Sequence, residues 1–428
     1  MRIVFVTDVR SAISQSWIGH FVNRGDDVHI ISSYPCPPDI IRGARVYELP
    51  IAFAALSRIS HNGTIASKKP PSVLARGIAA LRIGSLSGLS VIARSWLGPI
   101  DLHRYVARAR DLIESISPDI VHAMRIPFEG ILAAKATPLR FPLLISVWGN
   151  DFTLFAESNP LIARQTRQTL RRADALHCDC RRDLRLAVRD WGFGGEKPAT
   201  VLPGAGGVDT SVFNPEGGAS ELRERLRIPP GARVVINPRG FRGYVRNDNF
   251  FQSIPLILKQ HPETIFLCVG MQANPVAEKW INRLSIQESM RLLPNMPHKE
   301  MAELFRLAEV SVSLSLHDGT PNSLLEALAC GCFPVAGNIE SIREWIVDKE
   351  NGLLCDSTNP RSVADAITRA LSDHGLRERA RETNVRMVIE RAEYTKVMCE
   401  AEKFYKLVIQ QSEGVSDVRN QRRYQLGR

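Results

Sequence analysis

The sequence of 428 residues lacks long apolar runs. No window approaches the roughly 18 consecutive apolar residues that a membrane-spanning helix needs. The apolar run after Arg2 covers only residues 3–6, which is too short for a secretory signal. With 44% apolar and 23% charged residues, the composition is typical of a soluble globular protein, and we expect a cytoplasmic location.

Cysteine and histidine do not occur in metal-binding patterns. Eight cysteines without a secretory signal predict free thiols rather than a disulfide framework. Cys178-x-Cys180 and Cys330-x-Cys332 lack the two-residue gap of zinc knuckles, and the ten histidines are scattered. We therefore expect no metal ion and no resident cofactor.

Acidic residues are scarce in the first half of the chain. Residues 1–200 hold 26 Lys and Arg against 17 Asp and Glu, so nearly all of the net charge of +10 lies there. The deficit is greatest over 51–110, where Asp101 is the one acid among nine basic residues. A basic half favours an anionic partner, such as nucleic acid, a phosphate-bearing acceptor or an anionic membrane surface.

Residues 74–96 place apolar side chains on one helical face, with Arg76 and Arg94 opposite. One interpretation is a basic amphipathic helix that lies on the inner face of a membrane. The alternative is a helix that packs on its own domain with solvated arginines. Three glycines in this segment weaken a free-standing helix.

Length and pattern predict two α/β domains, because a chain of this length exceeds one compact core. Apolar strands alternate with helical segments, beginning with a strand over 2–7, a helix over 14–23 and a strand over 28–31. This opening is typical of a doubly wound parallel sheet. The Gly- and Pro-rich stretch 203–231 is the predicted linker, and 234–237 is the first strand of the second domain.

The stretch 311–356 carries the clearest chemical signal. Its first six residues alternate apolar side chains with serines and predict a strand, 317–321 is a loop, and Asn322 and Ser323 are the expected N-caps of a helix. A loop that leaves a parallel strand and enters a helix presents backbone N–H groups and the positive end of the helix dipole. We therefore expect the loop to fit an anion such as a diphosphate.

Two carboxylates flank this loop. Asp318 lies in it and Glu326 lies on the helix, so both side chains can face one crevice. Carboxylates beside a phosphate site commonly accept hydrogen bonds from sugar or ribose hydroxyls.

The same residues resemble the signature of glycosyltransferase family 4, whose members have the GT-B fold. That signature is an acidic residue, seven residues, a Glu, a helix, a Cys-Gly turn and a Pro-Val strand. Asp stands here where a first Glu is more usual, which shortens the side chain by one methylene. The matching residues are Asp318, Glu326, 329–331, 334–335, 340–344 and 351–354.

This resemblance implies two Rossmann-like, doubly wound parallel-sheet domains that face a cleft, with a C-terminal helix that crosses back to the first domain. The expected bounds are an acceptor-side domain over 1–205, completed by about 395–411, and a donor-binding domain over 206–394. Residues 412–428 are expected to form a disordered tail.

The resemblance also implies an activity: a metal-independent, retaining transfer of a sugar from a nucleotide diphosphate sugar to a glycan or lipid-linked acceptor. The excess of basic residues in the first half adds the expectation of a lipid-linked acceptor at a membrane surface, as in the synthesis of cell-surface polysaccharide or lipopolysaccharide. No nucleic acid is then expected as a partner.

The implied donor site includes an arginine after the first strand of the second domain, and Arg239 matches it. Family members have a Lys five residues further on, where Tyr244 stands, so Arg242 or Arg246 would complete the diphosphate clamp. Asp318 would orient the donor sugar, and Glu326 would bind the ribose diol. The phosphates or sugar would be held by the loop residues Gly319, Thr320, Pro321, Asn322 and Ser323.

On the acceptor side, Trp148, Gly149, Asn150 and Asp151 follow the predicted strand 143–147. The family often has a His where Trp148 stands, so the indole is at most an aromatic platform. Asn150 and Asp151 are candidates for acceptor or sugar contacts, although Asp151 is equally well explained as a helix cap.

Two other classes of protein stay open. A nucleotide-sugar epimerase of the same fold would need titratable acid–base residues in its cleft, and none is evident in the sequence. A catalytically silent sugar-nucleotide-binding protein would keep the donor motif without turnover. Fold alone does not separate these from a transferase.

Overall fold

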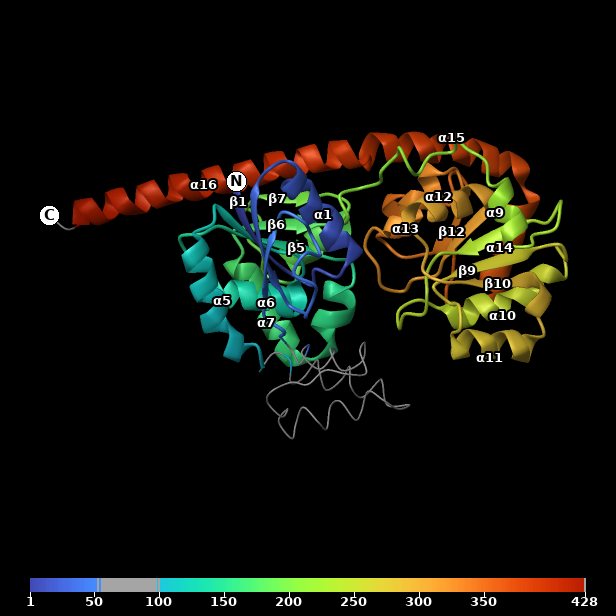
Figure 1. The fold of residues 1–428 in the computed structure, drawn as a ribbon, viewed down its shortest axis with the longest axis horizontal. Helices are drawn as coiled ribbons and strands as arrows, with labels where there is room; N and C mark the ends of the chain where they lie inside the picture. The colour runs from blue at the N-terminus through green and yellow to red at the C-terminus, as the bar shows by residue number, and fades with distance from the viewer. Residues whose placement is uncertain (52–53, 55–97, 99–100, 427–428) are drawn as a thin grey trace. The chain divides into compact units, whose positions relative to one another are not determined.

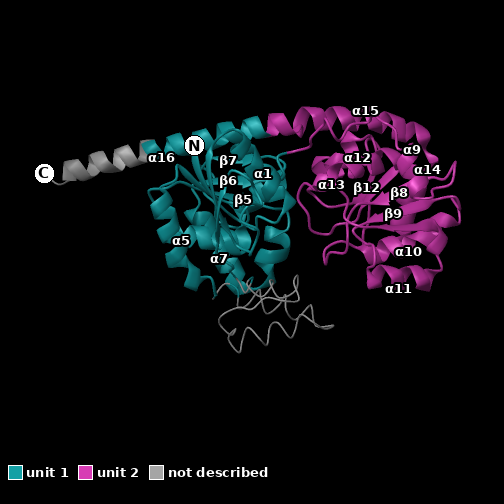
Figure 2. Ribbon diagram, in the orientation of Figure 1, with its two compact units in different colours: residues 1–206, 398–428 teal, residues 207–397 magenta. Residues whose placement is uncertain are grey.

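The computed structural model describes residues 1–426 except 52–53, 55–97 and 99–100, so the segment predicted to be amphipathic, 74–96, lies outside the described residues (Figure 1). The chain forms two compact units (Figure 2). Unit 1 comprises residues 1–206 and 398–428, and unit 2 comprises 207–397. These boundaries lie near the expected positions 205 and 394.

Unit 1 contains a seven-stranded parallel sheet of order β3-β2-β1-β4-β5-β6-β7. The strands are β1 (Arg2–Thr7), β2 (Asp27–Ser32), β3 (Arg45–Glu48), β4 (Ile120–Ala123), β5 (Leu143–Val147), β6 (Ala175–Cys178) and β7 (Ala199–Val201). The described α-helices before residue 206 are α1 (Ala12–Asn23), α5 (His103–Ile116), α6 (Ile131–Ala136), α7 (Pro160–Arg172) and α8 (Arg181–Arg189).

Alternate residues of β1 show why this sheet is covered on both faces. Val4 and Val6 belong to the core that includes residues of α5, α6, α7 and α8. Phe5 faces the other way, where its ring lies 5.9 Å from that of Phe21 on α1. A strand buried on both faces is read in sequence as a continuous apolar run, as 3–6 is.

Unit 2 contains a six-stranded parallel sheet of order β10-β9-β8-β11-β12-β13. The strands are β8 (Val234–Asn237), β9 (Ile265–Val269), β10 (Met290–Leu293), β11 (Val310–Ser313), β12 (Phe333–Gly337) and β13 (Leu353–Cys355). Its α-helices are α9 (Ser220–Arg225), α10 (Asn247–Leu258), α11 (Pro275–Leu284), α12 (His298–Leu307), α13 (Asn322–Ala329), α14 (Pro360–Ser372) and α15 (His374–Arg391).

The strand order reverses beside the first strand of each sheet, between β1 and β4 in unit 1 and between β8 and β11 in unit 2. In open parallel sheets the loops at the carboxyl ends of two such strands diverge, and ligands bind between them. The predicted fold class, two doubly wound parallel-sheet domains, is confirmed.

The C-terminal helix α16 (Tyr394–Leu426) starts in unit 2 and continues in unit 1, as expected for the crossing helix. Val208 and the turn before α16 are hydrogen-bonded, with Val208 N donating to Ala392 O at 2.7 Å. The helix extends through Leu426, and the disorder expected from residue 412 stays a prediction. Neither α16 nor any other described helix has an apolar stretch capable of crossing a bilayer.

Candidate functional site

The loops that follow β8 and β11 in unit 2 are joined by backbone hydrogen bonds. Arg246 N donates to Leu314 O at 3.0 Å, and Leu316 N donates to Tyr244 O at 2.8 Å. The reversal of strand order therefore brings the arginine-rich loop 238–246 beside the loop that carries Asp318.

Arg239 and Asp318 form an ion pair across this junction. Arg239 Nη2 lies 2.8 Å from Asp318 Oδ2, and the two side chains are only 10% and 17% exposed. Asp318 also accepts hydrogen bonds from Ser315 Oγ at 2.9 Å and from Gly319 N at 3.2 Å. Two residues predicted separately from sequence, 79 positions apart, thus meet at one point.

Two buried asparagines that the sequence reasoning missed support the Arg239 loop. Asn237, at the end of β8, accepts a hydrogen bond from Arg239 N at 3.0 Å and donates to Asn247 Oδ1 at 2.9 Å. Asn247 in turn donates to Gly240 O at 3.2 Å. The sequence signal that could have identified Asn237 is its place at the end of an apolar strand, because a buried amide needs hydrogen-bond partners.

Arg242 and Arg246 differ in environment. Arg246 donates twice to Asp248 at the start of α10, with distances of 2.9 and 2.7 Å, and this contact holds the guanidinium in place. Arg242 is exposed, and its Nη1 lies 3.5 Å from the hydroxyl of Tyr244.

No side chain among the described residues caps the start of helix α13. Its N-cap residue is Pro321, whereas Asn322 and Ser323 are the first residues of the helix, so their prediction as N-caps is wrong. The reason is local: Pro321 adopts the extended conformation before the helix, and its carbonyl accepts from Leu324 N and Leu325 N. The first N–H groups of an uncapped helix are available to an anion.

Glu326 lies on α13 and is half-buried. Within the described part of the chain, its carboxylate has no hydrogen bond or ion pair, and burial raises its pKa to about 7. A carboxylate held in this way is ready to accept hydrogen bonds from hydroxyl groups of a ligand.

In unit 1, Arg125 binds Asn150 and Asp151, which are predicted for the acceptor side. Following β4, it donates to Asp151 Oδ1 and to Asn150 Oδ1, both at 2.9 Å. Asp151 is fully buried and also accepts from Ile126 N and Trp148 N. Burial raises the pKa of Asp151, and the charge of Arg125 opposes this. The hydrogen-bond partners of the Asp151 carboxylate thus lie outside the helical turn that Asp151 begins. This disfavours the interpretation of Asp151 as a helix cap.

Trp148 and Gly149 are likewise fixed within unit 1. The indole N–H of Trp148 donates to Met124 O, and a Cβ on Gly204 would lie 2.4 Å from the indole ring. Gly149 O accepts from Arg182 Nη2 at 2.6 Å. Trp148 is half-buried, so part of its surface is available as an aromatic platform.

One group of residues in the described chain has metal-like spacing: Asp179, Cys180 and Asp183. All three are buried, and Arg182 Nη2 lies 2.7 Å from Asp183 Oδ1. Burial raises the pKa of Cys180 well above its usual value and that of Asp183 to about 6. The guanidinium of Arg182 already balances the charge of Asp183, which disfavours a cation at this group.

His122 belongs to a buried chain of hydrogen bonds. Its Nδ1 contacts the hydroxyl of Tyr405, its Nε2 lies 2.7 Å from Ser146 Oγ, and Ser146 Oγ lies 2.8 Å from His177 Nδ1. His177 Nε2 lies 2.9 Å from Leu202 O. A carbonyl only accepts, so His177 donates through Nε2, and the same logic along the chain makes Nε2 the protonated nitrogen of His122.

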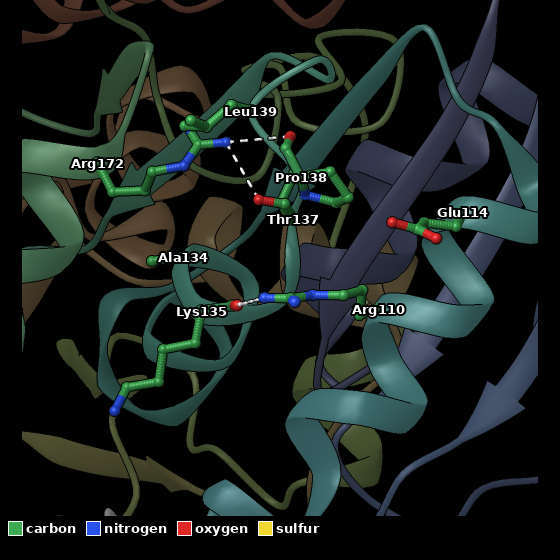
Figure 3. Close-up of a pocket in the computed structure, with 8 residues that line it drawn as sticks. All are labelled: Arg110, Glu114, Ala134, Lys135, Thr137, Pro138, Leu139 and Arg172. Atoms are coloured by element: carbon green, nitrogen blue, oxygen red, sulfur yellow. Dashed lines mark hydrogen bonds between the residues drawn. The ribbon is translucent and has the colours of Figure 1, made fainter.

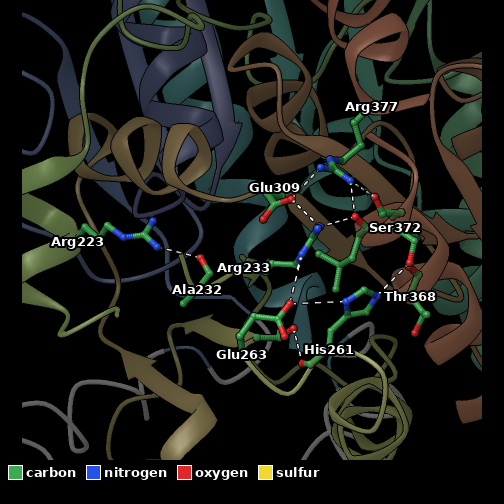
Figure 4. A network of polar contacts seen from close by, with 12 residues as sticks. Arg223, Ala232, Arg233, His261, Glu263, Glu309, Thr368, Ser372 and Arg377 are labelled. Atoms are coloured by element: carbon green, nitrogen blue, oxygen red, sulfur yellow. Dashed lines mark hydrogen bonds and ion pairs between the residues drawn. The ribbon is translucent and has the colours of Figure 1, made fainter. Parts of the chain in front are cut away.

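Two surface features lie at the opposite, amino-terminal edges of the sheets. A cavity of about 360 Å³ in unit 1 is lined in part by Arg110 and Arg172, which donate to carbonyls that follow α6 or end it (Figure 3). In unit 2, Glu309 pairs with Arg233 at 3.1 Å and Arg377 at 2.9 Å (Figure 4). These arginines have a structural role, because they donate hydrogen bonds to backbone carbonyls or pair with the carboxylate of Glu309.

Comparison with known proteins assigns both units. Residues 14–204 match the glycosyl transferase 4-like domain, and residues 219–387 match the glycosyl transferases group 1. A D-inositol 3-phosphate glycosyltransferase of Thermomonospora curvata is 28% identical over 222 residues, which are 48% of this chain and 51% of that one. One from Xylanimonas cellulosilytica is 28% identical over 223 residues. The matching part thus spans about half the length of these relatives.

Solved structures are similar over nearly the whole chain. The sucrose-phosphate synthase of Thermosynechococcus elongatus has a TM-score of 0.72 at 15% identity and covers 96% of this chain and 100% of its own. Anabaena HepE in complex with UDP has a TM-score of 0.68 at 14% identity and covers 94% and 99%. At this identity the structural similarity shows the fold alone. The matches to the family models show the family. The chain belongs to the group 1 glycosyltransferases and has the GT-B fold.

Proposed function

We propose that this protein transfers a sugar, with retention of configuration, from a nucleotide diphosphate sugar to a glycan or lipid-linked acceptor. The observation that carries the donor half of this proposal is the arrangement at the β8–β11 junction. There the Arg239–Asp318 pair lies beside α13. Among the residues that the structure describes, no side chain caps the start of this helix and none pairs with the carboxylate of Glu326.

Charge develops on the diphosphate as the sugar leaves, and fixed donors stabilise it without an acid or base. Arg239, with Arg246 or Arg242, would supply guanidinium donors. The loop residues Gly319, Thr320, Pro321, Asn322 and Ser323 would contribute the start of the helix and its N–H groups. Asp318 would release Arg239 to the phosphates and accept hydrogen bonds from the donor sugar.

Glu326 would accept two hydrogen bonds from the ribose diol. Its lack of any protein partner in the described chain supports this role, because a half-buried carboxylate without partners is costly. The similarity to Anabaena HepE, which was solved with UDP, supports a uridine nucleotide as the first donor to test.

We infer that arginines rather than a metal ion neutralise the diphosphate. The support is the number of guanidinium groups in loop 238–246. Activity that is unchanged by EDTA would agree with this inference, and activity restored by Mg²⁺ after chelation would contradict it.

For the acceptor, we propose the carboxyl edge of the unit 1 sheet. Trp148, Gly149, Asn150 and Asp151 follow β5 there, and Arg125 binds Asn150 and Asp151. The excess of basic residues in the first half of the sequence supports an acceptor at an anionic membrane surface, as in polysaccharide synthesis on the cytoplasmic face. Retention of the protein by liposomes with anionic lipid at low salt tests this location, and failure to bind them would remove it.

The decisive experiment is calorimetric titration with UDP, GDP and ADP on the wild type, Glu326→Ala and Glu350→Ala. Glu350 is exposed and lies before β13, at the amino-terminal edge of the sheet, so it is the matched control. We expect one nucleotide to bind the wild type and Glu350→Ala alike, and to bind Glu326→Ala at least tenfold more weakly. Absence of binding to all three nucleotides would contradict the proposal.

Turnover separates the remaining classes of protein. A transferase releases nucleotide from the sugar nucleotide only when an acceptor is present, whereas an epimerase changes the sugar without releasing nucleotide. A silent binding protein does neither. The anomeric configuration of the product, measured by NMR, tests retention.

A further inference from the structure

Trp345 contacts the loop that carries Asp318 and Thr320. It follows the short helix η6 (Ile342–Glu344) after β12, and its indole N–H donates to Thr320 Oγ1 at 3.1 Å in a buried contact. Thr320 is two residues past Asp318. A second contact comes from the same segment, since Ser341 Oγ donates to Asp318 O at 2.7 Å.

The segment that carries Trp345 is fixed by packing. Trp345, Ile342 and Ile346 are buried in the core that includes the apolar face of α13. Tight packing of this kind transmits a displacement rather than absorbing it. The position of Trp345 and the start of α13 are therefore linked through a common core.

Two buried asparagines hold the backbone of Trp345. Asn351 Nδ2 donates to Trp345 O and to Asn384 Oδ1, and Asn384 Nδ2 returns a bond to Asn351 O, each at 2.9 Å. Asn384 lies on α15, so this paired amide arrangement anchors the segment to a long helix.

Arg391 covers one face of the Trp345 indole. Its guanidinium carbon lies 4.2 Å from the centre of the Trp345 ring, and its Nη2 donates to Glu344 O at 3.1 Å. A cation stacked on an indole restricts rotation of the ring and so fixes the direction of the N–H.

We propose that Trp345 is a positioning residue for the donor site. An indole N–H only donates, so Thr320 Oγ1 accepts, and the direction of its own O–H is restricted. Trp345 thereby fixes the orientation of the Thr320 hydroxyl and the position of the loop between Asp318 and α13. This inference rests on the proposed donor site, and it assigns that role to a residue outside the acidic-residue signature.

The test is nucleotide binding in a double-mutant cycle, using the nucleotide that the wild type binds. Trp345→Phe keeps an aromatic ring for Arg391 and removes the N–H, and Thr320→Val removes the acceptor. Because one hydrogen bond contributes about 0.5–1.5 kcal/mol, each change should weaken binding roughly 2- to 13-fold. The double variant should be no weaker than either single one, since both remove the same contact.

Matched variants guard against loss of folding. Thr320→Ser keeps the hydroxyl, so it should weaken binding less than Thr320→Val does. Trp280→Phe replaces a half-buried tryptophan on α11 and should leave affinity unchanged. A melting temperature lowered in Trp345→Phe at unchanged nucleotide affinity would show a purely structural role and overturn the inference, as would additive effects in the double variant.

The outcomes distinguish this inference from the function on which it rests. If the wild type binds one nucleotide and Trp345→Phe binds it equally well, only the role of Trp345 falls. If the wild type binds none of UDP, GDP and ADP, the donor site and the role of Trp345 both fall.

Discussion

Arg239 Nη2 lies 2.8 Å from Asp318 Oδ2, across the junction where the strand order of the second sheet reverses. The guanidinium that we assign to the diphosphate is therefore paired with a carboxylate before any substrate is bound. Donor binding must exchange this ion pair for a phosphate contact, which leaves Asp318 to accept hydrogen bonds from the sugar. The pair holds Arg239 in place and keeps its charge satisfied.

Replacement of Arg239 by Met should lower kcat about 100- to 1,000-fold, because loss of one fixed donor to developing charge has an effect of this order. Steady-state kinetics with saturating donor measures it. Arg242→Met is the matched control from the same loop, and its exposed side chain predicts a smaller loss. Equal losses for both variants would contradict a special role for Arg239.

Donor affinity should rise with pH around neutrality. The pKa of Glu326 is about 7 in the free protein, so the carboxyl is partly protonated there, whereas a ribose diol binds the ionised form. Affinity for a nucleotide sugar should therefore increase from pH 6 to 8 and level off above. Glu326→Gln should abolish this dependence. A sugar nucleotide is the right probe, because its diphosphate does not titrate in this range.

Acid should destabilise unit 1 through His177. Burial lowers the pKa of His177 from 6.5 to about 4, so between these values the unfolded chain takes up a proton that the folded protein excludes. The free energy of unfolding should fall as the pH is lowered from 6.5 to 4, by roughly 3 kcal/mol from this group. Urea denaturation at several pH values measures the change, and a His177→Gln variant should show a weaker dependence.

Removal of the Tyr405 hydroxyl should destabilise the docking of α16. In Tyr405→Phe, Trp17 Nε1, which now lies 3.0 Å from the hydroxyl, loses its acceptor, and His122 Nδ1 loses its donor. Buried polar atoms without partners cost about 1–3 kcal/mol. Thermal unfolding checks this expectation. Phe404→Leu, which preserves an apolar contact on the same helix, should cost less.

Gly207 cannot accept a side chain. Its φ is +90°, and a Cβ there would lie 2.2 Å from Ala392 O, the carbonyl that accepts from Val208 N. Gly207→Ala should lower the free energy of unfolding by more than about 1 kcal/mol. Gly218→Ala should be tolerated, because no atom of the described chain lies within 4 Å of a Cβ placed there. Similar stability of the two variants would argue that the segment near 207 relaxes freely.

Much of the architecture could be predicted from local pattern. Runs such as 3–6 and 234–236 are buried on both faces, and an apolar run bounded by polar loops reports that directly. The loop and helix start between Asp318 and Glu326 were also recognisable from sequence, because their turn and helix residues are contiguous. The start of α13 was misplaced by one or two residues, since Pro321 rather than a polar side chain ends the extended segment.

The sequence by itself determined two doubly wound parallel sheets, a donor-type loop and the residue types available there. Only the tertiary structure decided which of them meet. Arg239 with Asp318, Trp345 with Thr320, and Tyr405 with His122 are each separated by at least 25 residues. Their contacts follow from the order of strands in the sheet and from helix packing, which bring together strand ends and helix faces that no local pattern connects.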